Sequence, residues 1–185
     1  MGQYYAVAFK RSTDEKPVVN HRKVEKCDYI MAKLMEHSYF GNFIVDAVAK
    51  VLSKGKCRLA WVGDYADEDV EKVTNGELTY NDVWGENAKT GTPLPKSKFS
   101  YKGKYLVNWS KKEYISFDDY LKTQEKSLKI SPIPLMTVIG NGLGGGDYAG
   151  ENEDKVGSWA WDEISIEKNF PVDFTVRNDY YFIQT

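Results

Sequence analysis

Glycine dominates one short stretch of the chain, residues 139–150, and this stretch is the best indicator of a functional site. Six of its twelve residues are glycine. Because glycine weakens the interior of a helix or strand, the stretch is predicted to be a loop. It follows an apolar run, Ile133 to Ile139, that is typical of a buried strand. A strand that ends in a glycine-rich loop leaves bare backbone that another molecule can approach closely.

The spacing of these glycines suggests a phosphate cradle but does not complete one. Gly140, Gly142 and Gly145 satisfy the pattern G-x-G-x-x-G, and Asp162 lies about twenty residues beyond, as in dinucleotide-binding proteins. That fingerprint must open a helix, whereas residues 146–152 read as a loop. A Walker loop is excluded because no Gly-Lys-Ser/Thr follows. The bare N–H groups could still bind an anion.

The acidic residues after the glycines allow a second interpretation, a site for a hard cation. Their oxygens are of the kind that such cations prefer, but the defined spacing of a known calcium loop is missing. A solvated acidic loop is therefore the favoured interpretation. With two histidines and no paired cysteines in the chain, we expect no metal and no cofactor. The acids in question are Asp147, Glu151, Glu153 and Asp154.

Three residues are the candidates for acid–base chemistry if the chain is an enzyme. His37, in the run Glu36-His37-Ser38, is the best pH-sensitive group. Bonding to a backbone carbonyl is the favoured alternative for this ring. Asp64 follows a predicted strand, where ligands often bind, although it could instead cap the next helix. With Asp147 it would form a pair of carboxylates if both lie at one edge of the sheet.

The elements that must position these residues follow from apolar patterning. A strand is predicted over Tyr4 to Phe9, and its almost wholly apolar run indicates a central strand. A second strand is predicted over Cys57 to Val62. The main amphipathic helix covers residues 39–53, with Ser38 as N-cap and Gly55 as the stop. An acidic helix follows over Asp67 to Val73.

The second half of the chain is predicted to add further strands. Strands outnumber helices without alternating with them, which predicts one α+β domain over residues 1–185 with a mixed, mostly antiparallel sheet and short accessory helices. Residues 84–100 are predicted to be an irregular or mobile insertion. The remaining predicted elements are a hairpin of Lys104 to Trp109 with Glu113 to Phe117, a helix over Asp118 to Lys126, and strands within Gly157 to Glu167, Asp173 to Arg177 and Tyr180 to Ile183.

Composition limits the classes of function. The 185 residues are 42% hydrophobic, enough for a core, and the net charge of −2 disfavours generic duplex binding. No stretch approaches eighteen apolar residues, and no leader pattern opens the chain, so we expect a cytoplasmic protein without membrane contact and with reduced Cys27 and Cys57. A lysine- and aromatic-rich region over residues 96–112 contrasts with an acidic run over residues 64–71. The first suits either single-stranded nucleic acid or an exposed hairpin, and the second suits a basic protein partner.

Several segments together resemble a family of small proteins from bacteria and their phages. They include Met1 to Tyr5, Lys33 to Ser38, Trp61 to Asp67, Asn108 to Lys112, Pro132 to Leu135, Gly140 to Tyr148 and Gly157 to Ala160. The resemblance runs over most of the chain. It implies an anti-CRISPR protein that inhibits the type II effector Cas9 inside the bacterial host cell, and it implies no catalytic residues. Leu143 departs from the basic residue expected within the glycine loop, which weakens an anion-binding role.

Two hypotheses therefore stand. The first is a non-enzymatic binding protein that inhibits a host defence nuclease, with a guide-RNA-loaded nuclease as its partner. Its contacts would come from exposed aromatics such as Tyr148 and Trp84 and from residues Asp64, Tyr65, Asp67, Gly142, Gly144, Gly145, Gly146 and Asp147. The second is a small-molecule binder for a nucleotide signal, or a hydrolase acting on one, that uses the glycine loop with Asp64, His37 and Asp147.

Overall fold

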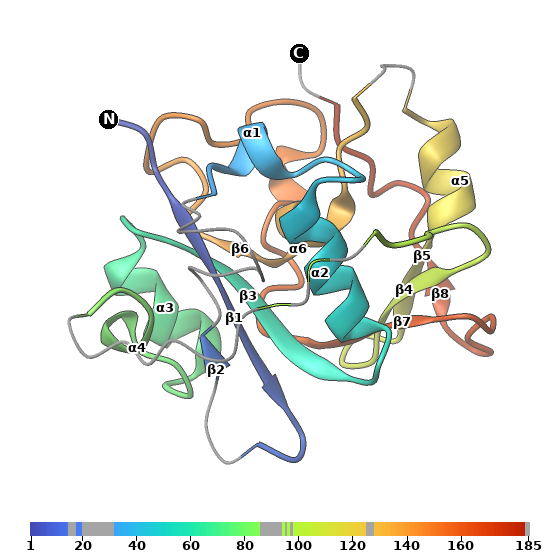
Figure 1. Cartoon of the computed structure of the whole chain (residues 1–185), viewed down its shortest axis with the longest axis horizontal. Coiled ribbons are helices and arrows are strands. Elements are labelled where there is room, and N and C mark those ends of the chain that lie inside the picture. Colours follow the sequence, from blue (N-terminus) through green and yellow to red (C-terminus); the bar gives the residue numbers. More distant parts are fainter. Residues whose placement is uncertain are drawn as a thin grey trace.

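The chain forms one α+β domain with a mixed, mostly antiparallel sheet and several short helices (Figure 1). The computed structural model describes residues 1–14, 18–19 (backbone only), 32–85, 94, 96, 98–124 and 128–183. The strands are β1 (Tyr5–Arg11), β2 (Val18–Val19), β3 (Cys57–Gly63), β4 (Tyr105–Asn108), β5 (Glu113–Ser116), β6 (Val138–Ile139), β7 (Glu163–Glu167) and β8 (Thr175–Val176). The helices are α1 (Leu34–His37), α2 (Phe43–Leu52), α3 (Asp67–Thr74), α4 (Tyr80–Trp84), α5 (Phe117–Lys122), α6 (Pro132–Thr137) and the 3-10 turn η1 (Glu153–Lys155).

The sheet has the strand order β2-β1-β3-β7-β4-β5-β8, with β6 as an additional partner of β3. Two strands share one edge of β3. β7 pairs antiparallel with Cys57 and Arg58, and β6 pairs parallel with Trp61 and Val62. Besides β3–β6, the pairing of β5 with β8 is parallel. The short β6 matters for function because it delivers the glycine loop to the end of β3.

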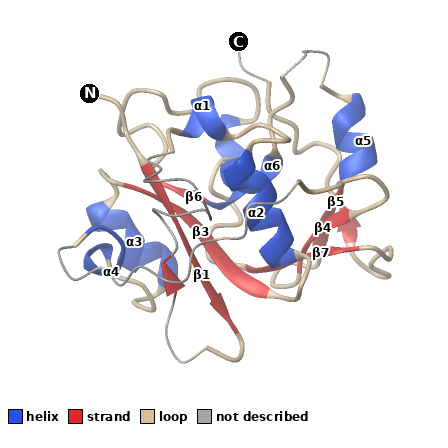
Figure 2. Cartoon of the chain, in the orientation of Figure 1, coloured by secondary structure: helices blue, strands red, loops and turns tan. Residues whose placement is uncertain are grey.

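The central strands β1 and β3 are buried on both faces. Alternate residues, such as Val7 and Leu59, enter the larger core with α2 and α6, while Ala6, Ala8 and Ala60 face a smaller core under α3 and α4. Figure 2 shows α2 crossing the sheet and α3 with α4 grouped at one side. Two-sided burial explains the unbroken apolar run of β1 and confirms the prediction of a central strand there.

The main helix is confirmed, but it is shorter than predicted. α2 begins after Asn42, whose side chain accepts from the Ile44 N–H, and it ends at Ser53. Ser38 is not the N-cap; it is buried, and its carbonyl accepts from Ser131 N–H. Buried Asp46 within α2 accepts from the Tyr101 hydroxyl and the Phe99 N–H, so the lysine–aromatic region packs its rings inward.

The prediction of a strand over residues 133–139 is wrong for most of its length. Residues Pro132–Thr137 form the fully buried helix α6, and only Val138–Ile139 pair as a strand. The Ser131 hydroxyl caps the helix, and both prolines fall in its first turn, where a missing N–H costs nothing. A buried helix of this length shows the same apolar run as a buried strand.

Other boundaries differ for local reasons. Residues 157–162 form turns, so β7 begins only at Glu163, and residues 180–183 form no strand. α5 is capped by Ser116 rather than by Asp118 or Asp119. α4 was not predicted, although Thr79 and Asp82 form a reciprocal capping box at its start. Of the predicted insertion over residues 84–100, Trp84 ends α4, while 86–93, 95 and 97 lie outside the described residues.

The thiol of Cys57 offers a test of the packing at the start of β3. Burial raises its pKa from 9.0 to about 12. In a Cys27→Ser variant we expect no reaction with a thiol reagent at pH 8 under native conditions, and complete reaction in denaturant, because the thiolate is the reactive form. The thiol of Cys57 stays protonated to a higher pH in the folded state than in the unfolded chain. Its ionisation therefore lowers the free energy of unfolding as pH rises from 9 towards 12. Rapid native-state labelling would contradict this packing.

A glycine loop closed around an internal carboxylate

The glycine loop, residues 140–146, binds a carboxylate of the chain itself. The N–H groups of Gly142 and Gly144 donate to Oδ2 of Asp147 at 2.8 and 3.0 Å. The hydroxyl of Tyr5 donates to Oδ1 of the same group at 2.5 Å. Successive backbone N–H groups of this kind form an anion site. In this structure Asp147 therefore fills the anion site that the glycine spacing predicts.

Further bonds fix the loop at its base and along its length. The side chain of Asn141 accepts from the Tyr148 N–H and donates to the Tyr148 carbonyl. Gly145 pairs with the N-terminal segment, where its N–H reaches the Met1 carbonyl and its carbonyl accepts from Gln3. The carbonyl of Gly146 accepts from the Met35 N–H of α1. The loop is therefore tied to β1 and to α1 as well as to Asp147.

Glycine is required where the loop lies against the turn between β3 and α3. A Cβ on Gly140 would meet the Cβ of Ala66 at 2.6 Å, and the φ of +97° also favours glycine there. A Cβ on Gly144 would stand 2.6 Å from the Cβ of Gln3 and 3.1 Å from the ring of Tyr65. The glycine loop and the acidic segment that begins at Asp64 are thus neighbours on the folded chain.

Asp64 stands directly after β3, as predicted, but it does not cap α3. Its Oδ1 accepts from the Tyr4 N–H at 3.0 Å, and its own N–H donates to the Tyr4 carbonyl. The N-cap residue of α3 is Ala66, which makes no side-chain bond. The alternative of a helix cap is therefore wrong. Asp64 instead fastens the start of β1 to the end of β3.

Tyr5 brings the two predicted carboxylates into one electrostatic environment. Its ring is buried, and burial is the largest cause of a strongly raised pKa. The hydrogen bond and charge of Asp147 raise this pKa further, and the charge of Asp64 adds to them. Asp64 and Asp147 consequently lie near the same end of β1. Sequence reasoning did not identify Tyr5, because nothing local marks a strand tyrosine as a partner of a residue 142 positions away.

His37 is turned toward its own helix. Its Nδ1 lies 3.1 Å from both the backbone nitrogen and the carbonyl oxygen of Lys33. Among the described residues, no hydrogen bond or ion pair joins His37 to Asp64 or Asp147. The structure thus brings the two carboxylates together at one end of the sheet without presenting the imidazole to them.

Gln3 is a buried polar residue that sequence reasoning missed. Its side chain is fully buried, and neither amide atom has a hydrogen-bond partner in the described part of the chain. The amide lies over Gly63, where a Cβ would be only 1.8 Å from Nε2. An unsatisfied buried amide costs about 1–3 kcal/mol, so the floor beneath the glycine loop carries a destabilising group. No sequence signal distinguishes this glutamine.

The side chains that reach solvent here are mostly apolar and acidic, with Lys72 as an exposed cation on α3. Leu143 is 50% exposed and Tyr65 is 39% exposed. On α3 the carboxylates of Asp67, Glu68 and Glu71 are exposed. The prediction that Tyr148 is an exposed aromatic is wrong: its ring is buried, and its hydroxyl donates to the Glu151 carbonyl and accepts from the Ile183 N–H. A buried ring there anchors the end of the loop to the C-terminal segment.

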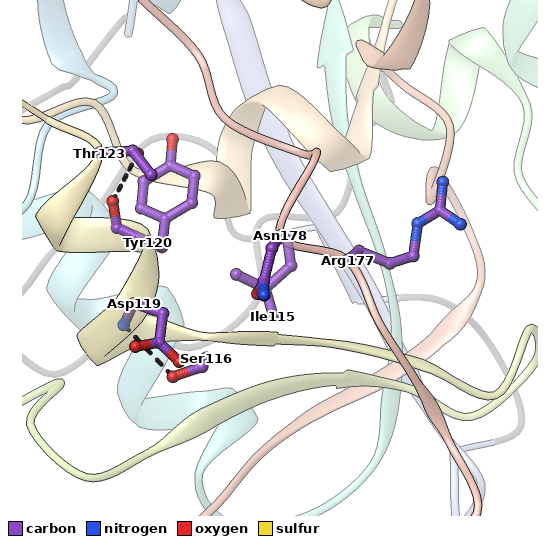
Figure 3. Close-up of a pocket in the computed structure, with 7 residues that line it drawn as sticks. All are labelled: Ile115, Ser116, Asp119, Tyr120, Thr123, Arg177 and Asn178. Atoms are coloured by element: carbon purple, nitrogen blue, oxygen red, sulfur yellow. Dashed lines mark hydrogen bonds between the residues drawn. The ribbon is translucent and has the colours of Figure 1, made fainter.

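A cavity of about 250 Å³ lies elsewhere, between β5, α5 and the turn after β8 (Figure 3). Its lining is mixed, with the hydroxyls of Ser116 and Thr123 beside Ile115. The guanidinium of Arg177 points away from Asp119 and pairs with Glu113 and Asp179. None of the residues predicted to act in catalysis lines this cavity.

The described residues contain neither a cluster of metal ligands nor a membrane-spanning helix. No three His, Cys, Asp or Glu side chains there gather as ligands for a metal ion. No helix of the described ranges is long and apolar enough to cross a membrane. A family model, a curated protein and a solved structure were each sought for comparison, and none matches the chain.

The internal carboxylate makes a quantitative prediction about stability. Asp147→Ala leaves two loop N–H groups and the Tyr5 hydroxyl without an acceptor, so we expect a loss of about 2–4 kcal/mol in the free energy of unfolding. Tyr5→Phe removes one donor and keeps the ring, so about 1–2 kcal/mol is expected. Urea unfolding of both variants and of the double variant measures these terms. If the loss of unfolding free energy in the double variant equals the sum of the two single losses, the result would contradict a hydrogen bond between Tyr5 and Asp147.

Proposed function

We propose that this protein binds a host protein and inhibits it, and that the partner is a guide-RNA-loaded defence nuclease, Cas9. The observation that carries the proposal is the acidic face of α3 beside the glycine loop. In the described part of the chain, its four carboxylates form no ion pair and no side-chain hydrogen bond. They are Asp67, Glu68, Asp69 and Glu71.

The charge of this face fits a partner that itself binds nucleic acid. Nucleases of this type hold their RNA–DNA heteroduplex in a positively charged channel. An exposed acidic face is attracted to such a channel and competes with phosphates for the same lysines and arginines. Occlusion of the channel would then block the nuclease without any chemistry by the inhibitor.

The structure of the lysine–aromatic region supports a protein partner over direct binding to single-stranded nucleic acid. Tyr101 is buried, and Phe99 packs against the core. Trp109 is only partly buried, but the ammonium of Lys56 lies 3.6 Å from the centre of its ring. Stacking of bases needs accessible aromatic faces. These rings serve packing instead.

The small-ligand hypothesis is less well supported by the geometry. A nucleotide phosphate at the glycine loop would have to displace Asp147 from the N–H groups of Gly142 and Gly144. A hydrolase using His37 would have to turn the imidazole away from the Lys33 backbone. Substrate binding at this site therefore requires the loss of existing hydrogen bonds.

The acidic face is tested by charge reversal. Glu68→Lys with Glu71→Lys is expected to weaken binding to guide-loaded Cas9 at least about tenfold and to relieve inhibition of DNA cleavage, because like charges now face each other. Lys72→Glu on the same helix should preserve or tighten binding. Glu153→Lys with Asp154→Lys, two exposed changes on η1, is the control because it alters the total charge by the same amount. Binding by the wild-type protein should weaken with added salt.

Two outcomes would contradict the proposal. One is the absence of binding and of inhibition by the wild-type protein at micromolar concentration. The other is equal inhibition by the reversed and unreversed proteins. A loss of inhibition counts as support only when the circular dichroism spectrum of the reversed protein matches that of the wild type. The comparison of spectra is needed because acidic residues in the first turn also stabilise a helix, so their reversal can destabilise α3 itself.

A further inference from the structure

We propose that Tyr65 and Leu143 form the apolar centre of the partner-binding surface, and that Asp147 holds Leu143 in its binding position. This inference rests on the proposed function and adds to it the residues that fix the partner. The occupant is a basic protein surface with an apolar recess at its middle. The acidic helix α3 supplies the charged rim.

The two apolar side chains are neighbours in the fold. The ring of Tyr65 lies against Gly144, where a Cβ would be 3.1 Å from its Cδ2, and Leu143 is the residue just before this glycine. Both are exposed although most large apolar side chains of the described chain are buried. Val73, on the outer side of α3, is also exposed. Tyr65 and Leu143 are therefore the apolar side chains exposed where the loop meets the turn before α3.

The position of Leu143 is fixed from both sides. Gly142 and Gly144, its two neighbours, donate to the same oxygen of Asp147. The other oxygen of this carboxylate accepts from the buried Tyr5, and so connects the loop tip to the central strand of the sheet. A glycine-rich loop would otherwise sample many conformations. This arrangement lowers the entropy lost when Leu143 enters a partner's recess.

The chemistry around this centre indicates what the partner presents. Protein interfaces combine an apolar centre with a polar rim, and complementary charge sets their orientation and association rate. On α3 the rim carries four carboxylates against the single ammonium of Lys72. A partner segment with lysine or arginine around an apolar recess satisfies both features.

The test measures affinity and dissociation rate for guide-loaded Cas9 with single truncations. Leu143→Ala and Tyr65→Ala are each expected to weaken binding about tenfold or more, mainly through faster dissociation. Leu128→Ala is the matched control, since Leu128 is 64% exposed and lies outside this surface. It should bind within about twofold of wild type, as scattered exposed apolar residues carry no function.

The positioning role of Asp147 has its own variant. In Asp147→Ala no side-chain oxygen remains to accept from Tyr5 or from the loop N–H groups. We expect weaker binding with Leu143 still present, and we expect Leu143→Ala to cost less affinity in this background than in the wild type. A cost unchanged between the two backgrounds would overturn the positioning role. Leu143→Ala in the wild-type background is a surface change, so that measurement does not depend on the stability of Asp147→Ala.

The failure of this inference differs from the failure of the proposed function. If Leu143→Ala and Tyr65→Ala bind like wild type while the α3 reversal abolishes binding, the apolar centre is wrong and the acidic face stands. If the wild-type protein binds no guide-loaded Cas9, the proposed function is wrong, and this inference is overturned with it.

Discussion

The bond between Asp147 and the N–H groups of the glycine loop is the interaction on which the conformation of this loop depends. The Asp147 carboxylate accepts from the N–H groups of Gly142 and Gly144, which would otherwise be available to an external anion. Through the Tyr5 hydroxyl it also connects the loop to β1, a central and largely buried strand of the sheet. A flexible, glycine-rich sequence thereby becomes a defined surface. The same bond turns a predicted ligand site into a predicted platform for protein contact.

The remaining structure supports this one contact. β6 lies parallel to β3 and delivers the loop to the strand end where Asp64 fastens β1. The glycines at 140 and 144 then allow the loop to lie against Ala66 and Tyr65. The unsatisfied amide of Gln3 beneath them is a cost that the fold tolerates at this end of the sheet.

Much of the fold could be predicted from the sequence, because its signals are local. The apolar runs of β1 and β3 and the helical spacing of α2 depend only on neighbouring residues and were predicted close to their observed bounds. α6 was not predicted correctly, since a short buried helix and a buried strand share one pattern, and the prolines at 132 and 134 indicated a strand boundary as readily as a first turn. The density of glycine is likewise a local signal, and it predicted the loop at residues 140–146. The chemistry of this loop was not predicted, because the partner of Asp147 is a tyrosine at the opposite end of the chain.

We infer that the anion site of the glycine loop is occupied by the carboxylate of Asp147 and is therefore not free to bind a ligand. The most direct measurement follows the amide resonances of Gly142 and Gly144 in ¹H–¹⁵N spectra during titration with inorganic phosphate and with ATP. We predict that neither resonance shifts in a saturable way and that both amides are protected from hydrogen exchange. Saturable shifts of these two amides in the wild-type protein, absent in an Asn141→Ala variant with a loosened loop, would contradict the claim.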